Sequence, residues 1–406
     1  MSEENPVPDA GNESPNDAEA AVPANEAAVP ASPAPEEDRP SFLRRLLRSR
    51  TTRAVAAAAV AGALLGAGTV AWRTDTLPLL GPSPCWDSLG SGTMDELFGD
   101  RRTEVEEQSL RTDPQGDGLS YGQCRITSYK DDRAMRQVTV NVHRLDGLRG
   151  TDARKWPQEF LAAGMVSLGD GLPGMASGSR AWIALPQSCT GRDEFTGPTV
   201  VDIGMGLAGL DISSEYERED RSALTGAVVE TANGVIRELG CSGTYTAPRT
   251  LPAPVDWKDA EADAFCGIEG FTLPGAHRKD LSHVRIGGEG GPARVCEAGG
   301  SYREAVVRLT TVTDPALSEI YSSDALRTGE PVKSAPGPGY GYGKLAGNRA
   351  VFRAVCQTGP VVFVVEQLRG TEKGSFSLSR DLLPGYASAE AERIGCGPLK
   401  LKLPGA

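Results

Sequence analysis

The eight cysteines of this 406-residue chain fall into two groups of four with similar spacing. An even number of cysteines in matching frames is typical of disulfide-bonded domains in an oxidising compartment. Because the frames match, we expect each half of the chain to fold with its own disulfides. Four cysteines allow three pairings in each half. The pairs that we favour are Cys85 with Cys124, Cys189 with Cys241, Cys266 with Cys296, and Cys356 with Cys396.

The region before the first cysteine is predicted to be a tail followed by a membrane helix. Residues 1–40 carry ten acidic side chains and one arginine, and they contain no aromatic residue, leucine or isoleucine. Such a segment buries too little apolar surface to offset its ordering entropy, so we expect disorder. Five arginines follow between residues 44 and 53, and residues 54–72 carry no charge. As a helix these 19 residues reach about 28 Å, close to the thickness of a bilayer core.

The five arginines predict the orientation of this span. By the positive-inside rule, residues 1–53 lie in the cytoplasm as an acidic tail ending in a basic cluster, and the chain after residue 72 lies outside the cell. A cleavable signal peptide is the competing interpretation, because small residues near Gly66, Ala67 and Ala71 suit a peptidase. A leader of 53 residues before the apolar region is far longer than usual, which favours the membrane span.

Matching features beyond the cysteines indicate an internal repeat. Each half has an alternating strand (136–143 and 305–309), a loop rich in glycine and proline (169–174 and 335–343), an apolar strand (199–203 and 361–365) and a helix that ends in Gly-Cys. The sequence therefore predicts an α+β fold of two tandem disulfide-braced repeats, 85–245 and 257–406. Each is expected to be a small antiparallel sheet with packed helices. The proline-containing segments 73–84 and 246–256 are predicted linkers.

Local patterns predict three helices. Thr93-Met94-Asp95-Glu96 matches a capping box ahead of Leu97 and Phe98. Apolar residues recur at helical spacing from Leu224 to Leu239, and Gly240 suits the position after the last turn. The second-half helix, 387–394, is more weakly indicated, because Pro384 and Gly385 interrupt its start.

Histidines and acidic runs do not form a recognisable catalytic or metal site. His143 lies on the polar side of its strand, where we expect an exposed histidine. His277 and His283 could share a metal with Asp280, but their spacing favours a surface loop. The acidic runs at 104–107 and 215–220 are interpreted as solvated faces. We therefore name no catalytic, cofactor-binding or metal-binding residue.

Nucleophile and phosphate-binding patterns are also missing. The sequence has no Gly-x-Ser-x-Gly elbow, and its even cysteine count suggests no free thiol. The glycine-rich runs 287–291 and 336–343 are read as turns. Tyr340 and Tyr342 in the second run are possible binding residues, because aromatic side chains are enriched at binding surfaces. Arg180 and Arg349 precede a cysteine in matching phrases, and we interpret both as structural.

The Ala-rich apolar segment, the Cys85-Trp86-Asp87-Ser88-Leu89 motif, the helix after it and the later paired cysteines together resemble a loose family. They are similar to the uncharacterised membrane-anchored extracytoplasmic proteins of actinobacteria, including streptomycetes. The resemblance implies a setting at the cell envelope and carries no activity over to particular residues.

These observations favour a single-pass membrane protein with an extracytoplasmic binding module. Its partners would be the membrane, through residues 54–72, and an unknown envelope ligand or protein. The net charge of −12 argues against a nucleic-acid partner. One alternative is an envelope hydrolase that uses dispersed carboxylates. Another is a transmembrane sensor, for which phosphorylation of Ser14 or Ser32 in the tail would be evidence.

Overall fold

The computed structural model describes residues 82–112, 120–145, 152–189, 197–207, 218–327, 329–335, 339–371 and 376–405. The predicted tail, the predicted span at 54–72 and most of the predicted linker 73–84 lie outside these residues. None of the helices in the described ranges is both long and apolar enough to cross a membrane.

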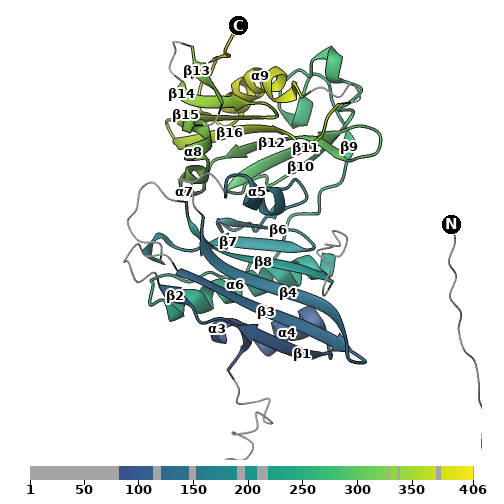
Figure 1. Ribbon diagram of the computed structural model, residues 1–406, viewed down its shortest axis with the longest axis vertical. Coiled ribbons are helices and arrows are strands. Elements are labelled where there is room, and N and C mark those ends of the chain that lie inside the picture. The colour runs from purple at the N-terminus through teal and green to yellow at the C-terminus, as the bar shows by residue number, and fades with distance from the viewer. Residues whose placement is uncertain are drawn as a thin grey trace, which may run out of the picture. The chain divides into compact units, whose positions relative to one another are not determined.

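The first half of the described chain forms an antiparallel sheet of eight strands (Figure 1). Its order is β1-β3-β4-β8-β7-β6-β5, and β2 pairs with β3. The long strands follow from the alternation in the sequence, since Val138, Val140 and Val142 are buried on one face of β4. The bounds are β1 Arg102–Glu107, β2 Arg111–Thr112, β3 Ser120–Lys130, β4 Arg133–Arg144, β5 Val166–Ser167, β6 Gly174–Ala176, β7 Arg180–Ala184 and β8 Thr199–Leu207.

Helix α6 (Arg218–Glu238) covers the apolar face of this sheet. It ends as predicted, with Gly240 at a φ of 67° and the Cys241 amide donating to the Ile236 carbonyl. The predicted capping box is wrong. Helix α4 (Ser91–Phe98) begins after Gly90, so Thr93 lies inside the helix and is buried. The other helical segments are α3 (Pro84–Asp87), α5 (Lys155–Phe160) and η1 (Gln187–Cys189).

The second half forms an antiparallel sheet of nine strands, ordered β17-β13-β14-β15-β16-β12-β11-β10-β9. Its central strands are valine-rich and are buried on both faces. The bounds are β9 Lys258–Asp259, β10 His283–Gly287, β11 Ala293–Gly299, β12 Ala305–Val312, β13 Glu330–Ser334, β14 Tyr340–Ala346, β15 Arg349–Cys356, β16 Gly359–Gln367 and β17 Leu401–Lys402.

Helix α9 (Leu378–Arg393) covers one face of the second sheet and begins nine residues before the predicted start at residue 387. It continues through Pro384, which removes one helical hydrogen bond. Burial of Leu382, Leu383 and Tyr386 against the sheet compensates, so the predicted interruption is wrong. The remaining segments are η2 (Phe265–Gly267), η3 (Gly275–His277), α7 (Pro315–Ser318), η4 (Glu319–Tyr321) and α8 (Ser322–Arg327).

The two sheets use the same strand order. From edge to edge the first reads β1-β3-β4-β8-β7-β6-β5, and the second contains β10-β11-β12-β16-β15-β14-β13 between β9 and β17. In both, the last long strand leads to the covering helix, α6 or α9. The first cysteine of each set adopts a left-handed backbone, with φ of 57° at Cys85 and 59° at Cys266. Cys85 is bonded to Cys124 on β3, and Cys266 is bonded to Cys296 on β11. Because β3 and β11 hold the same place in the strand order, Cys124 and Cys296 mark corresponding points in the two sheets.

Four disulfides brace the two sheets, and no cysteine in the described ranges is free. They indicate an oxidising environment. Each lies within one half of the chain, and the pairs are the favoured ones: Cys85–Cys124, Cys189–Cys241, Cys266–Cys296 and Cys356–Cys396.

Three apolar clusters hold residues 81–406 together as one unit. One lies between the first sheet and helix α6, and another lies between the second sheet and helix α9. We call the opposite face of each sheet its outer face. The third cluster joins the two outer faces, with Trp182 and Val200 from the first sheet and Val362 and Val364 from the second. Helix α5 and the α7–α8 region also contribute side chains to this cluster.

Candidate functional site

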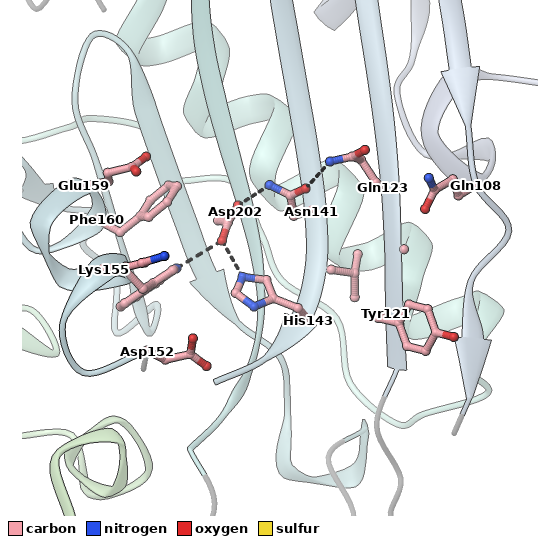
Figure 2. Close-up of a pocket in the computed structure, with 13 residues that line it drawn as sticks. Gln108, Tyr121, Gln123, Asn141, His143, Asp152, Lys155, Glu159, Phe160 and Asp202 are labelled. Carbon is pink, nitrogen blue, oxygen red and sulfur yellow. Dashed lines mark hydrogen bonds and ion pairs between the residues drawn. The ribbon is translucent and has the colours of Figure 1, made fainter. Parts of the chain in front are cut away.

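A pocket of about 520 Å³ opens on the outer face of the first sheet (Figure 2). Strands β3, β4 and β8 form its floor, and residues 152–160, which include α5, form one side. We call residues 152–160 the wall segment. The lining residues are Gln108, Tyr121, Gly122, Gln123, Asn141, Val142, His143, Asp152, Lys155, Trp156, Glu159, Phe160 and Asp202.

Asp202 is the central polar group of the pocket floor. It lies in the apolar strand β8 and is 1% exposed. Three side chains donate to or share a proton with its carboxylate: Asn141 Nδ2 at 3.0 Å, His143 Nε2 at 2.7 Å and Trp156 Nε1 at 3.0 Å. A buried carboxylate is costly unless it is hydrogen-bonded and paired, and this arrangement supplies both.

The hydrogen bonds continue across neighbouring strands. Gln123 Nε2 donates to Asn141 Oδ1 at 3.0 Å, and the main-chain N–H of Gln108 donates to the main-chain carbonyl of Gln123. Pairing of β3 with β4 and of β4 with β8 places Gln123, Asn141 and Asp202 directly opposite one another. Figure 2 shows them in a row that Gln108 extends. We call Gln123, Asn141, His143 and Asp202 the polar network.

His143 is not the exposed strand histidine that the sequence predicts. Its side chain is 33% exposed, and its Nε2 is bonded to Asp202. Burial alone would lower the pKa of His143, but the hydrogen bond and charge of Asp202, with a smaller contribution from Asp152, raise it above the ordinary value. The carboxylate of Asp202 therefore stabilises the imidazolium form of His143.

Aromatic side chains shape the rest of the pocket. Trp156 stacks on Phe160, with ring centroids 5.4 Å apart, and meets the edge of Trp182 at 5.0 Å. All three rings are buried, and Trp182 Nε1 donates to the Phe160 carbonyl. Tyr121 differs, because it is 46% exposed at the opposite side of the pocket from α5 (Figure 2).

Two arginines of the second sheet hold the wall segment. Arg308 donates from Nη1 to the carbonyl oxygens of Pro157, at 3.1 Å, and Gln158, at 3.4 Å. Arg349 donates from Nη2 to the Ala153 carbonyl. Main-chain groups of the pocket side are thereby anchored to a part of the chain about 150 residues or more away in sequence.

The corresponding positions of the second sheet are apolar, apart from one threonine. With Cys124 matched to Cys296, the pairing registers place Gln123, Asn141, His143 and Asp202 at the positions of Val295, Thr310, Val312 and Val364. All four counterparts are buried. These four positions of an outer face can therefore be largely apolar, so sheet formation alone does not explain the polar network.

Charged residues elsewhere on the outer face of the second sheet serve packing. Glu297 is buried and bonded to Arg285 Nη2 at 2.9 Å and to Arg308 Nη2 at 2.7 Å. Burial alone would raise the pKa of Glu297, but the charges and hydrogen bonds of the two arginines lower it. Arg349 pairs with Glu366 at 2.9 Å and Asp324 at 3.2 Å.

The possible binding residues Tyr340 and Tyr342 lie away from this pocket, on strand β14. The glycine-rich segment that we expected to be a loop is a strand from Tyr340 onward. Residues 336–338 lie outside the described ranges. Tyr340 is 60% and Tyr342 38% exposed, and they pair with Val355 and Arg353 of β15. Neither tyrosine lines the pocket on the first sheet or either of two smaller pockets in the described part of the chain.

The remaining candidates are placed as follows. His277 bonds to Asp381 at 2.9 Å and His283 lies 3.4 Å from Asp259. In the described ranges, no three His, Cys, Asp or Glu side chains are placed to hold a metal ion. Asp220, read as part of a solvated run, is in fact buried and paired with Arg136 at 2.8 Å.

Sequence reasoning missed Asp202, Asn141 and Gln123. One signal was available, because Asp202 is the only charged residue in the apolar strand 199–207. The chain matches no protein-family model, and comparisons with curated proteins and with solved structures found no match. The site must therefore be interpreted from its own chemistry.

Proposed function

We propose that this protein is an extracytoplasmic binding module that takes a small polar ligand in the pocket on its first sheet. The observation that carries the proposal is the contrast between the polar network and its largely apolar counterpart in the second sheet. A pocket of this volume is in the range of small-molecule sites, which combine apolar walls with a few convergent polar groups.

The cost of the network supports a role in binding. Asp202 is buried in an apolar strand and needs Asn141, His143 and Trp156 to satisfy it. Replacing buried ionic groups by apolar residues of similar volume is often neutral or stabilising. The second sheet has valine at the position of Asp202. A polar group retained where an apolar one would suffice is a candidate for recognition.

The setting that we propose is the cell envelope, with the two sheets as tandem copies of one fold. The shared strand order and the matching disulfides support the duplication. In this arrangement the first copy carries the ligand site and the second copy supports its wall segment. A membrane helix at 54–72 with a cytoplasmic tail remains part of the proposal, and it rests on the sequence alone.

A carboxylate-dependent hydrolase is the second candidate. Asp152, Glu159 and Asp202 all line the same pocket, which is the grouping that such an enzyme needs. However, Asp202 is buried and already bonded to Asn141, His143 and Trp156, so its carboxylate is engaged in the floor of the pocket. Binding without turnover is therefore the better-supported function.

The test uses the full-length chain, purified in mild detergent, and a panel of sugars, amino acids, peptides, nucleotides and lipid headgroups. Ligand-observed NMR would detect binding, and product analysis would detect turnover. We expect at least one class to bind unchanged and to lose binding in Asn141→Leu, whereas Thr310→Val, at the matching position of the second sheet, keeps it.

Gln123→Leu is a second pocket variant, because it leaves the contacts of Asp202 intact. Circular dichroism and non-reducing electrophoresis would establish that each variant is folded. The proposal is wrong if no class binds, if both pocket variants bind as well as the unaltered chain, or if a bound compound is consumed. Consumption that Glu159→Gln or Asp152→Asn abolishes would favour the hydrolase.

A further inference from the structure

We infer that the pocket recognises a neutral polyhydroxylated ligand, of the size of one or two sugar rings. This inference rests on the proposed binding function and specifies its ligand. It follows from three properties of the lining: charges of both signs, a row of side-chain amides and an exposed aromatic ring.

The charges of the pocket do not favour an ionic ligand. Lys155 and His143 are its basic groups, and Asp152, Glu159 and Asp202 its acidic ones. His143 and Asp202 already satisfy each other at 2.7 Å. A phosphate or a carboxylate ligand would meet acidic groups as well as Lys155, and a cation would meet Lys155 and His143. A lining of one sign would attract either kind of ion more strongly than this mixed lining does.

The amide row suits hydroxyl groups. Gln108, Gln123 and Asn141 each carry both donor and acceptor atoms. Gln123 donates one of its amide hydrogens to Asn141, which leaves Oε1 and a second hydrogen for a ligand. A hydroxyl likewise donates and accepts, so vicinal hydroxyls can match neighbouring amides in both directions. Strand spacing of about 4.8 Å places these amides within reach of a single ring.

Tyr121 supplies a flat apolar surface beside that row. It lies two residues before Gln123 on β3 and therefore on the same face of the sheet. Pyranose rings have one face of C–H groups, and burying such a face on an aromatic ring removes apolar surface from water. Trp156 is buried and bonded to Asp202, and Phe160 is buried and stacked on Trp156, so Tyr121 is the exposed aromatic ring of the lining.

The pocket volume of about 520 Å³ is compatible with this ligand size. A polyol also explains why the floor is held rigidly. Asp202 fixes Asn141, and Asn141 fixes Gln123, so the donors and acceptors are oriented before the ligand arrives. Such preorganisation lowers the entropic cost of binding a ligand that competes with water for every hydrogen bond.

The test is titration of the full-length chain with maltose, trehalose and N,N′-diacetylchitobiose, followed by calorimetry and saturation-transfer NMR. The comparison probes are sodium glutamate, inorganic phosphate and N-acetyl-alanyl-glutamine amide, which is neutral and rich in hydrogen-bonding groups. We expect a sugar to bind, with saturation transfer strongest to its C–H protons. Affinity should fall by about tenfold or more in Tyr121→Ala and in Gln123→Leu, the scale of one lost ligand contact.

Tyr121→Phe is the matched control, because it keeps the ring and should retain affinity to within about threefold. Tyr340→Ala, at an exposed tyrosine outside the pocket, should have no effect. The inference is overturned if the peptide or a charged probe binds through Asn141 while no sugar does, and the binding function then stands. It is also overturned if sugar binding survives both pocket variants. If no probe binds at all, the inference fails, and the wider ligand panel then decides the proposed function separately.

Discussion

Arg308 in the second sheet donates a hydrogen bond to the main-chain carbonyl of Pro157, 3.1 Å away, in the wall segment of the first. The same guanidinium is held by Glu297, at 2.7 Å from Nη2 and 2.9 Å from Nε. A buried ion pair of one sheet thus positions one side of the pocket on the other. The positions of the second sheet that match the polar network are largely apolar. This contact nevertheless gives the second sheet a role in the site.

Loss of Arg308 should weaken both stability and the pocket. In Arg308→Met the buried carboxylate of Glu297 keeps only Arg285, and we expect the free energy of unfolding to fall by about 3 kcal/mol. Urea denaturation of the full-length chain measures this loss. Ligand affinity should also fall, because Pro157 and Gln158 lose their anchor. Arg327→Met, at an exposed arginine of α8, is the control; equal effects of the two variants would contradict this role.

Glu297 should make stability depend on acid pH. Burial opposes its ionisation, but Arg308 and Arg285 outweigh burial and hold its pKa below the usual 4.5. A depressed pKa contributes stability that is complete above the unfolded value and is lost as the pH falls through the folded value. Unfolding free energies of the unaltered chain and Glu297→Gln should therefore differ more at pH 7 than at pH 3. A difference that grows toward low pH would refute the assignment.

His143 should act in the opposite direction. Burial lowers the pKa of His143, but the hydrogen bond and charge of Asp202 raise it by a larger amount. The folded pKa therefore lies above 6.5. A raised pKa gives stability that is complete below the unfolded value and is lost as the pH rises through the folded value. The difference in unfolding free energy between the unaltered chain and His143→Gln should thus be larger at pH 5.5 than at pH 8.5. NMR titration of the imidazole would check the pKa directly.

Gly287, at the end of β10, allows the second sheet to approach the first closely. A Cβ there would overlap the carbonyl oxygens of Ala163 and Met165, which follow the wall segment. Gly287→Ala should therefore lower the free energy of unfolding by about 2–3 kcal/mol. Gly92→Ala, in α4 with open space around it, should instead leave it unchanged or raise it by up to about 1 kcal/mol. Thermal unfolding measures both variants. If they lost comparable stability, the close approach of the two sheets at Gly287 would be contradicted.

The disulfides should stabilise each sheet separately. Cys85–Cys124 closes a loop of 39 residues, for which chain entropy predicts about 4 kcal/mol. The double variant Cys85→Ala, Cys124→Ala should lose this amount in urea denaturation. Non-reducing peptide mapping should recover the other three pairs unchanged. A disulfide that joins the two halves of the chain would contradict the separate folding of the sheets.

Features with a short sequence period were predictable. Alternation at Val138, Val140 and Val142 predicted β4, and helical spacing from Leu224 to Leu239 predicted α6. The matching cysteine frames predicted that each half forms its own disulfides, and the favoured set of the three pairings possible in each half is the one found. Each of these predictions depends on residues close in sequence or on the number of cysteines, so no knowledge of the packing was needed.

The functional face was not predictable in the same way. Alternation places His143 and Asn141 on one side of β4, but it does not tell whether water, a helix or a second sheet covers that side. Asp202 reaches them only because β8 returns to pair with β4. Similarly, Pro384 is tolerated because α9 is buried against its sheet. The sequence alone determined the two disulfide-braced α+β halves, since periodicity and cysteine number are local properties. The tertiary structure decided which polar residues share a pocket, because strand pairing and the contact between sheets bring together side chains far apart in the chain.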